Sequence, residues 1–203
     1  MRRASGRRWH SASLAGGAVL GCALTVAAFE LPYANWRATA PPVDTETLTI
    51  RQDAKGDGRF LAPRSGGRRH RGIDLVAELN SPVHAMLSGT VVQVGIHRGL
   101  GRFVELEHRH ALHSLYAHLN DVEVAPGQRI RQGEVIGTVG KTGNARSRLV
   151  TPHVHLEVLK NGEPVDPQTL GLRVLTPPAR LAHDDADNGA AAMEHANDAS
   201  GGE

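Results

Sequence analysis

The sequence of 203 residues contains a single cysteine and few aromatic residues. Cys22 lies in an apolar segment near the N-terminus, so no disulfide bond can form within the domain that follows. Aromatic residues make up only 3% of the chain, and basic residues are hardly interleaved with them, which excludes the usual pattern of a nucleic-acid-binding surface. The lack of disulfide bonds does not indicate the cytoplasm, because exported proteins can also lack them.

The longest apolar run, Leu14–Phe29, is short for a membrane-spanning helix, which usually needs about 20 apolar residues. It follows four arginines, and this order of basic and apolar segments is typical of an export signal. Three outcomes stay open: retention as an inner-membrane anchor, cleavage after Ala28, or lipidation at Cys22 in the poor lipobox VLGC. We expect an exported protein of the periplasm or cell envelope, anchored by residues 14–29, with secretion after cleavage near Ala28 as the alternative.

Helical periodicity is absent from the central part of the chain, where apolar residues instead alternate with polar ones. Residues 104–107, 115–119 and 154–158 alternate in this way, as half-buried strands do. In the second of these strands we expect Tyr116 and His118 to share one face. Abundant glycine and proline (23 and 11 residues) favour tight turns between strands. The pattern predicts an all-β domain with long connecting loops and no helix longer than a short turn.

Changes in composition divide the chain into four parts. The expected parts are a leader or anchor at residues 1–34, a linker at 35–47, a folded domain at 48–172 and a disordered tail at 173–203. Within the domain, the segments GTVVQVG and GEVIGTVG resemble each other, which is consistent with a duplicated hairpin or with similar turns alone.

Two short polar clusters indicate a chemical function. His70 and Asp74 stand in RRHRGIDL, and His153 and His155 stand in TPHVHLEV, where residues two apart on a strand project to the same face. Together they offer three zinc ligands and one further imidazole. A catalytic zinc site uses three protein ligands and leaves the fourth position to water, whose pKa the metal lowers toward neutrality. The clusters therefore predict a zinc-dependent hydrolase.

Each cluster alone also has an ordinary structural interpretation. A His-x-His pair on a solvated strand is common by chance. Asp74 lies in an apolar stretch and needs a cation or several hydrogen-bond donors, which the neighbouring arginines are able to supply in place of a metal: Arg68, Arg69 and Arg71. His118, in LYAHL, would by itself be structural. The remaining domain histidines have no partner at ligand spacing: His84, His97, His108, His110 and His113.

The motifs HRGID, YAH and HVH, in this order, resemble those of the lysostaphin-type, or LytM-domain, zinc metallopeptidases, which cut peptidoglycan peptides. The resemblance spans roughly Gly56 to Pro167 and also covers PVHAMLSGTVVQVG, VAPGQRIRQGEVIGTVGKTG and NGEPVDP. It implies an antiparallel β-sheet core with a duplicated hybrid motif and long loops that form a groove. The glycine-rich loops around Gly99, Gly101 and Gly143 are expected to let an extended peptide approach the backbone.

The resemblance also assigns roles to individual residues. It implies that His70, Asp74 and His155 bind Zn²⁺, and that His118 and His153 are the catalytic histidines beside the bound water. His153 is expected to act as general base and His118 to stabilise the oxyanion of the intermediate. The expected reaction is hydrolysis of peptide bonds in the cross-links or stem peptides of peptidoglycan.

Two other functions are compatible with parts of the sequence. Some relatives that have lost ligands are catalytically silent activators of cell-wall amidases, although all five site residues are present here; an amidase is thus a further candidate partner beside peptidoglycan peptides. A carrier domain modified at Lys141, in GKTG, explains none of the histidines. The sequence favours the peptidase.

Overall fold

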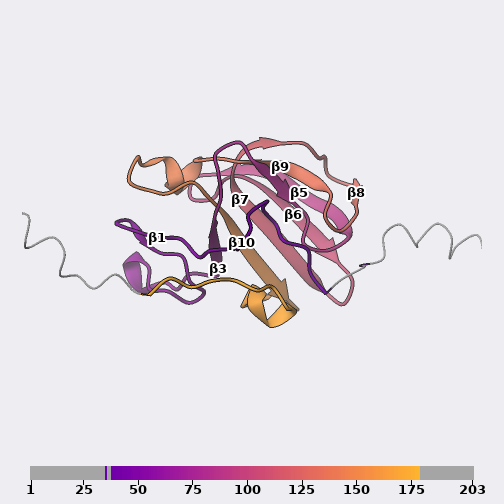
Figure 1. Cartoon of the computed structure of the whole chain (residues 1–203). Helices are drawn as coiled ribbons and strands as arrows, with labels where there is room; N and C mark the ends of the chain where they lie inside the picture. The colour runs from indigo at the N-terminus through magenta and orange to yellow at the C-terminus, as the bar shows by residue number, and fades with distance from the viewer. Residues whose placement is uncertain (1–34, 36–37, 179–203) are drawn as a thin grey trace, which may run out of the picture.

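The computed structural model describes residue 35 and residues 38–178, which form an all-β fold as the sequence predicts (Figure 1). Within this part of the chain, nine strands make one antiparallel sheet and two short strands make a separate hairpin. The hairpin consists of β1 (Gln52–Asp53) and β2 (Gly56–Asp57). The large sheet consists of β3 (Gly72–Val76), β4 (Pro82–His84), β5 (Gly89–His97), β6 (Gly101–His108), β7 (Leu112–Val122), β8 (Arg129–Ile130), β9 (Val135–Val139), β10 (His153–Lys160) and β11 (Glu163–Val165).

Helical structure among the described residues is limited to single turns of 3-10 helix. These are η2 (Ser65–Gly67), η3 (Gly143–Arg146) and η4 (Pro167–Leu170). The expectation of no helix longer than a short turn is therefore confirmed for this part of the chain. No helix in the described ranges has the length and apolar character needed to span a membrane.

Strand β7 connects the parts of the large sheet. Its first half pairs with β6 on one side and β10 on the other, and its last residues pair with β9 after a register shift between Leu119 and Val122. Strand β10 in turn pairs with β3 through a separate register, in which His155 lies opposite Asp74. The strands that carry the site motifs are therefore neighbours in the sheet.

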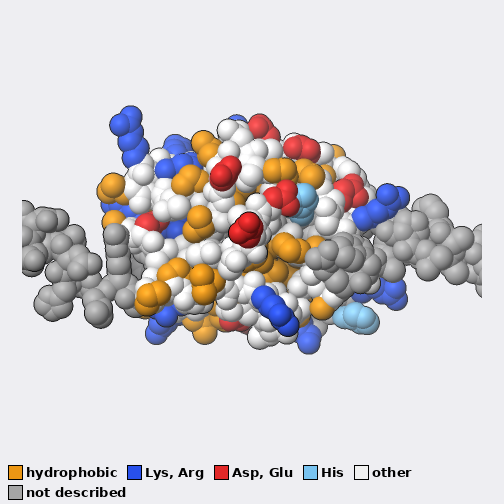
Figure 2. Space-filling view, viewed as in Figure 1, with side chains coloured by type: hydrophobic (Ala, Val, Ile, Leu, Met, Phe, Trp, Pro, Cys, Tyr) orange, Lys and Arg blue, Asp and Glu red, His pale blue; other side chains and the backbone are white. Residues whose placement is uncertain are grey.

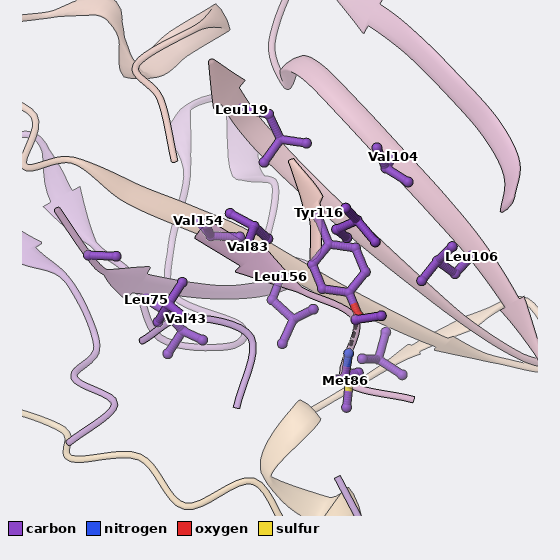
Figure 3. Packing of buried hydrophobic residues seen from close by; sticks show 14 of the residues in the cluster. Val43, Leu75, Val83, Met86, Val104, Leu106, Tyr116, Leu119, Val154 and Leu156 are labelled. Carbon is purple, nitrogen blue, oxygen red and sulfur yellow. Dashed lines mark hydrogen bonds between the residues drawn. The ribbon is translucent and has the colours of Figure 1, made fainter. Parts of the chain in front are cut away.

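The hydrophobic core lies on one face of these strands. Val154 and Leu156 of β10 are fully buried there, beside Tyr116 of β7 and Leu106 of β6 (Figure 3). Tyr116 is the largest fully buried side chain, and its hydroxyl accepts a hydrogen bond from the Met86 amide at 2.8 Å. Alternation along β10 sends its apolar residues into this core and leaves the two histidines for the other face.

The expected placement of Tyr116 and His118 on one strand face is wrong. Tyr116 lies in the core together with Leu119, whereas Ala117 lies opposite His155 and the His118 ring is 6.0 Å from that of His155. His118 adopts a φ of 63°, in the left-handed region that non-glycine residues rarely occupy. This conformation interrupts the alternation, so that two consecutive residues reach the side of the sheet that carries the histidines.

Part of the segment expected to be a linker packs against the domain. Val43 is buried and forms an isolated bridge with Val83, and the Ala40 amide donates to the Met86 carbonyl at 2.9 Å. The domain boundaries stay a prediction, but a fragment that begins at Leu48 would lack these contacts. The expected leader and most of the expected tail lie outside the described residues.

Candidate metal centre

Three potential metal ligands from distant parts of the sequence meet on the sheet. Suitable atoms of His70, Asp74 and His155 all lie within 4.8 Å of one another, and the three residues are buried. Asp74 and His155 are directly opposite in the β3–β10 pairing, which places their side chains on the same face. His70 lies just before β3, where its amide donates to the Ala62 carbonyl at 3.0 Å.

The three atoms form a nearly regular triangle. His70 Nε2 lies 2.9 Å from His155 Nδ1 and 3.1 Å from Asp74 Oδ1, and His155 Nδ1 lies 3.0 Å from Asp74 Oδ1. In a tetrahedral zinc site with bonds of about 2.0–2.1 Å, ligand atoms are about 3.3 Å apart. Two imidazole nitrogens and one carboxylate oxygen also belong to the donor types that zinc accepts. The residues present therefore fit a zinc ion.

Contacts behind the three ligands orient them toward one point. His70 Nδ1 donates to the Arg59 carbonyl at 2.8 Å, which leaves Nε2 with a lone pair. His155 Nε2 is 3.8 Å from a carboxylate oxygen of Glu157. Asp74 Oδ2 accepts from Arg51 Nη2 at 2.9 Å, so that Oδ1 is the oxygen that faces the histidines. Contacts of this kind fix the tautomers and orientations of metal ligands.

Two arginines balance the charge of Asp74, Arg51 at 2.9 Å and Arg64 at 3.7 Å, and neither is one of the three that the sequence suggested. Arg68 and Arg69 instead contact the carbonyls of Ser65 and Leu61, and Arg71 pairs with Glu157. No sequence signal marks Arg51, because it lies 23 residues before Asp74 and reaches it only through the fold.

Opposite effects act on the two central ionisable groups. Burial acts to raise the pKa of Asp74, but the close contacts of its carboxylate with His155 and His70 outweigh burial and hold this pKa well below its ordinary value. Burial acts to lower the pKa of His155, but hydrogen bonds to Asp74 and Glu157 outweigh burial and raise this pKa to about 9. Without a metal, His155 therefore carries a proton at neutral pH and forms an ion pair with Asp74.

Two further histidines stand beside the three ligands. The ring of His118 is 4.9 Å from that of His153, and His153 Nε2 is 3.9 Å from Asp74 Oδ1. His118 Nδ1 donates to the Thr142 carbonyl at 3.0 Å, and His153 Nδ1 donates to the Thr151 carbonyl at 2.7 Å. In both rings Nε2 is the nitrogen left for chemistry in the site.

Burial keeps both of these rings neutral. Desolvation, followed by the charges of His153 and His155, lowers the pKa of His118 to about 3. Desolvation also lowers the pKa of His153, against the opposing effect of the Asp74 charge. A neutral imidazole is the form that accepts a proton, so His153 is suited to act as a base at neutral pH, whereas the pKa of about 3 makes His118 a weak base.

Close packing between two loops holds His118 in place. Its amide donates to the Leu100 carbonyl at 2.8 Å, and a side chain added at Gly101 or Gly143 would collide with the backbone of the opposite loop. Both glycines also have positive φ values, of 68° and 62°. The expectation that these two glycines admit a substrate backbone is therefore wrong, because each admits the other loop.

The five residues line an open cleft of about 810 Å³. One side of the cleft is formed by residues 51–71, and the other includes Gly99, Leu100 and Asn144. Figure 1 shows the turns η2 and η3 below and above the left end of the sheet, on these two sides. A cleft of this size beside a buried donor set is a common form of ligand-binding site.

The other domain histidines have mostly structural contacts. His108 bonds to the Ser88 carbonyl and the Ser114 hydroxyl, His113 pairs with Glu105, and His84 pairs with Asp44. His97 differs, because it lines the cleft, and sequence spacing gave no sign of this position. Glu157 was also missed, although its place two residues after His155 on the same strand face was a usable signal.

Comparison with known proteins relates the chain to one family and to several characterised relatives. The model of Peptidase family M23 matches residues 68–167. DD-carboxypeptidase/endopeptidase Mpg of Neisseria meningitidis is 41% identical over 105 residues, which are 52% of this chain and 23% of that protein. Peptidoglycan DD-endopeptidase ShyC of Vibrio cholerae is 36% identical over 115 residues, 56% of this chain and 26% of that protein. The chain thus spans about a quarter of the length of these relatives.

Solved structures show the same fold. A zinc-containing peptidase from Vibrio cholerae superposes with a TM-score of 0.50 at 31% identity, over 66% of this chain and 39% of that one. The catalytic domain of the antimicrobial peptidase lysostaphin from Staphylococcus simulans superposes with a TM-score of 0.50 at 28% identity, over 58% of this chain and 91% of that one.

Proposed function

Because this chain belongs to peptidase family M23 through residues 68–167, we propose that it is a zinc-dependent endopeptidase that hydrolyses peptide bonds of peptidoglycan. The family and the likeness to lysostaphin confirm the resemblance found in the sequence motifs. One observation carries the proposal: three ligand atoms converge within 4.8 Å, and two neutral histidines stand beside them in an open cleft. The substrate class is supported by the relative ShyC, which is named a peptidoglycan DD-endopeptidase.

We assign the metal to His70, Asp74 and His155. Zinc bound there would supply a Lewis acid for the scissile carbonyl and lower the pKa of water. Arg51 holds Asp74 Oδ2 and so keeps Oδ1 directed at the histidines. The Arg59 carbonyl keeps the proton of His70 on Nδ1, away from the ligand triangle.

His153 is proposed as the general base. Its Nδ1 donates to the Thr151 carbonyl, which leaves Nε2 to accept the proton of the attacking water. The lowered pKa of His153 keeps this nitrogen unprotonated at neutral pH.

The role proposed for His118, stabilising the oxyanion, requires a proton on Nε2. A neutral His118 has none to offer there, because its single N–H already faces the Thr142 carbonyl. With a pKa of about 3, the free protein does not hold a second proton on this ring at neutral pH. Because His153 takes the proton of the attacking water, the proton that His118 needs for this role would come from solvent as negative charge develops on the substrate oxygen.

The test combines metal content with hydrolysis. The whole chain, reconstituted at neutral pH, is expected to contain about one zinc per molecule by elemental analysis and to release amino groups from purified peptidoglycan. His155→Ala should lose both. His110→Asn is the matched control, because His110 is exposed, lies in the β6–β7 turn and should affect neither.

Two results would contradict the proposal in different ways. Absence of zinc in the reconstituted wild type would show that these residues do not form a zinc site. Zinc at full occupancy without cleavage of peptidoglycan would keep the centre and favour the non-enzymatic alternative, an activator of cell-wall amidases. We also propose that the protein works in the cell envelope, where its substrate is found, as the export-type N-terminal sequence suggests.

A further inference from the structure

The cleft beside the candidate metal centre has one strongly basic side. Its basic lining residues come from a single stretch of 21 residues: Arg51, Lys55, Arg64, Arg68, Arg69 and Arg71. The acidic lining residues are Asp74 and Glu157. This excess of positive charge is local, because the whole chain carries a formal charge of only +2. The face in Figure 2 shows acidic side chains gathered over its centre and basic ones mainly toward its edge.

Three of these cations have no acidic partner among the described residues. Arg51 pairs with Asp53 and Asp74, and Arg71 pairs with Glu157 at 2.9 Å. Within the described part of the chain, no carboxylate forms an ion pair with Lys55, Arg68 or Arg69, and all three are exposed. Their charges are therefore available to a ligand in the cleft.

Hydrogen bonds to uncharged backbone carbonyls orient two of these unpaired arginines without neutralising their charge. Arg68 Nε donates to the Ser65 carbonyl at 3.2 Å, and Arg69 Nη1 donates to the Leu61 carbonyl at 3.3 Å. A guanidinium has five N–H donors, so each arginine keeps several for another group. Arginines held in this way are suited to bind carboxylates through paired hydrogen bonds.

The opposite side of the cleft is uncharged near the centre. It includes Gly99, Leu100, Asn144, Ala145 and Val150. The four site histidines and the carboxylate of Asp74 lie between the two sides, so a bound molecule meets a basic wall on the η2 side and a neutral wall on the η3 side (Figure 1).

We propose that the basic side binds a free carboxylate of the substrate, and that the preferred substrate is therefore an anionic peptide. The carboxylate contacts Arg68 and Arg69, while the uncharged part of the peptide lies toward η3. This inference rests on the proposed function, since it names the substrate class of the same site. Exposed ion pairs each contribute modestly, so the arginines act as selectors between charged and uncharged peptides and concentrate anions in the cleft.

The test uses a D,D-cross-linked peptide dimer released from peptidoglycan, in its free-acid form and with its carboxylates converted to amides. Binding to the zinc-loaded whole chain carrying His118→Ala, which prevents turnover, is measured by calorimetry. The free acid should bind about tenfold or more tightly than the amide. Adding Arg68→Gln and Arg69→Gln should remove most of this preference, because these substitutions weaken binding of the free-acid dimer and not of the amide dimer. Arg109→Gln with Arg173→Gln, two exposed arginines away from the cleft, should leave it unchanged.

Equal binding of the two dimers, no binding of either, or an equal loss in the control pair would overturn the inference. Thermal unfolding of each variant verifies that it folds. Hydrolysis of both dimers by the zinc-loaded wild type is followed in parallel. Equal cleavage of acid and amide would refute the charge selection and leave the peptidase intact, whereas cleavage of neither dimer would count against the peptidase itself.

Discussion

At the residue scale, the protonation of His155 in the metal-free protein makes the affinity for a metal ion depend on pH. In the metal-free protein this ring is held between Asp74 and Glu157, and its pKa is about 9. A metal ion must displace that proton before Nδ1 is able to coordinate it. Metal binding and proton release are therefore coupled in this centre.

We predict that zinc affinity rises about tenfold per pH unit between pH 6 and 8, because one proton is released from His155 on binding. A competition titration against a chelator of known affinity measures this slope. Glu157→Gln removes one of the groups that raise the pKa of His155, so the affinity should level off at a lower pH. A pH-independent affinity over this range would show that His155 is already neutral in the metal-free protein.

The sequence predicted the five residues that lie together at the candidate site, but not the residues that contact them. His70, Asp74, His118, His153 and His155 stand in short motifs with strong spacing signals. Arg51 and Thr142 contact Asp74 and His118 from distant segments, and no local pattern marks them. Contacts of this kind depend on which loops the fold brings together, and local residue patterns in a single sequence do not predict this.

At the scale of single elements, strand alternation predicted β10 correctly and β7 incorrectly. In β10 every second residue from Val154 to Val158 enters the core, because this part of the strand keeps an extended backbone. In β7 the positive φ of His118 changes the face on which the following residues lie. Histidine carries no sequence signal for this conformation, so the interruption was not predictable from the period of two.

The close packing of the loops that contain Gly101 and Gly143 predicts a difference in stability between two similar glycine substitutions. Gly101→Ala should lower the free energy of unfolding by about 3 kcal/mol or more, through the strain of positive φ and a collision with Thr142. Gly127→Ala has the same strain, with φ of 85°, but open space around its new side chain. It should cost only about 1 kcal/mol.

Urea unfolding of the two variants measures this difference. Because His118 bonds to both loops, Gly101→Ala should also lower peptidoglycan hydrolysis, while Gly127→Ala should not. Equal stabilities of the two variants would show that the loops separate without cost.

At the scale of the whole molecule, buried histidines make stability depend on pH in both directions. The pKa values of His108, His118 and His153 are lowered in the folded protein, in each case with burial as the largest cause. Their contribution is present above the unfolded pKa of about 6.5 and is lost as pH falls below it. The raised pKa of His155 acts oppositely, since its contribution is lost as pH rises from about 6.5 to about 9.

We therefore predict that the zinc-free chain is most stable near neutral pH. On acidification each of the three lowered histidines removes at most about 1.4 kcal/mol per pH unit, and usually less. Urea unfolding at pH 5, 7 and 9 measures the profile. His108→Gln keeps a side chain able to bond to Ser88 or Ser114 but does not titrate, so it should reduce the loss on the acid side alone. If the free energy of unfolding of this variant falls as steeply between pH 7 and pH 5 as that of the wild type, His108 does not contribute to the acid dependence.

The nine-stranded sheet brings together candidate metal ligands that are far apart along the chain. His155 contacts residues that precede it by 81 and 85 positions, Asp74 and His70. Contacts of such long range form only after most of the polypeptide has been made and the strands between them have found their partners. An incompletely folded chain thus lacks the candidate metal centre, whose residues meet only in the native state. In a cell, this order of events would delay any hydrolytic activity until folding is complete.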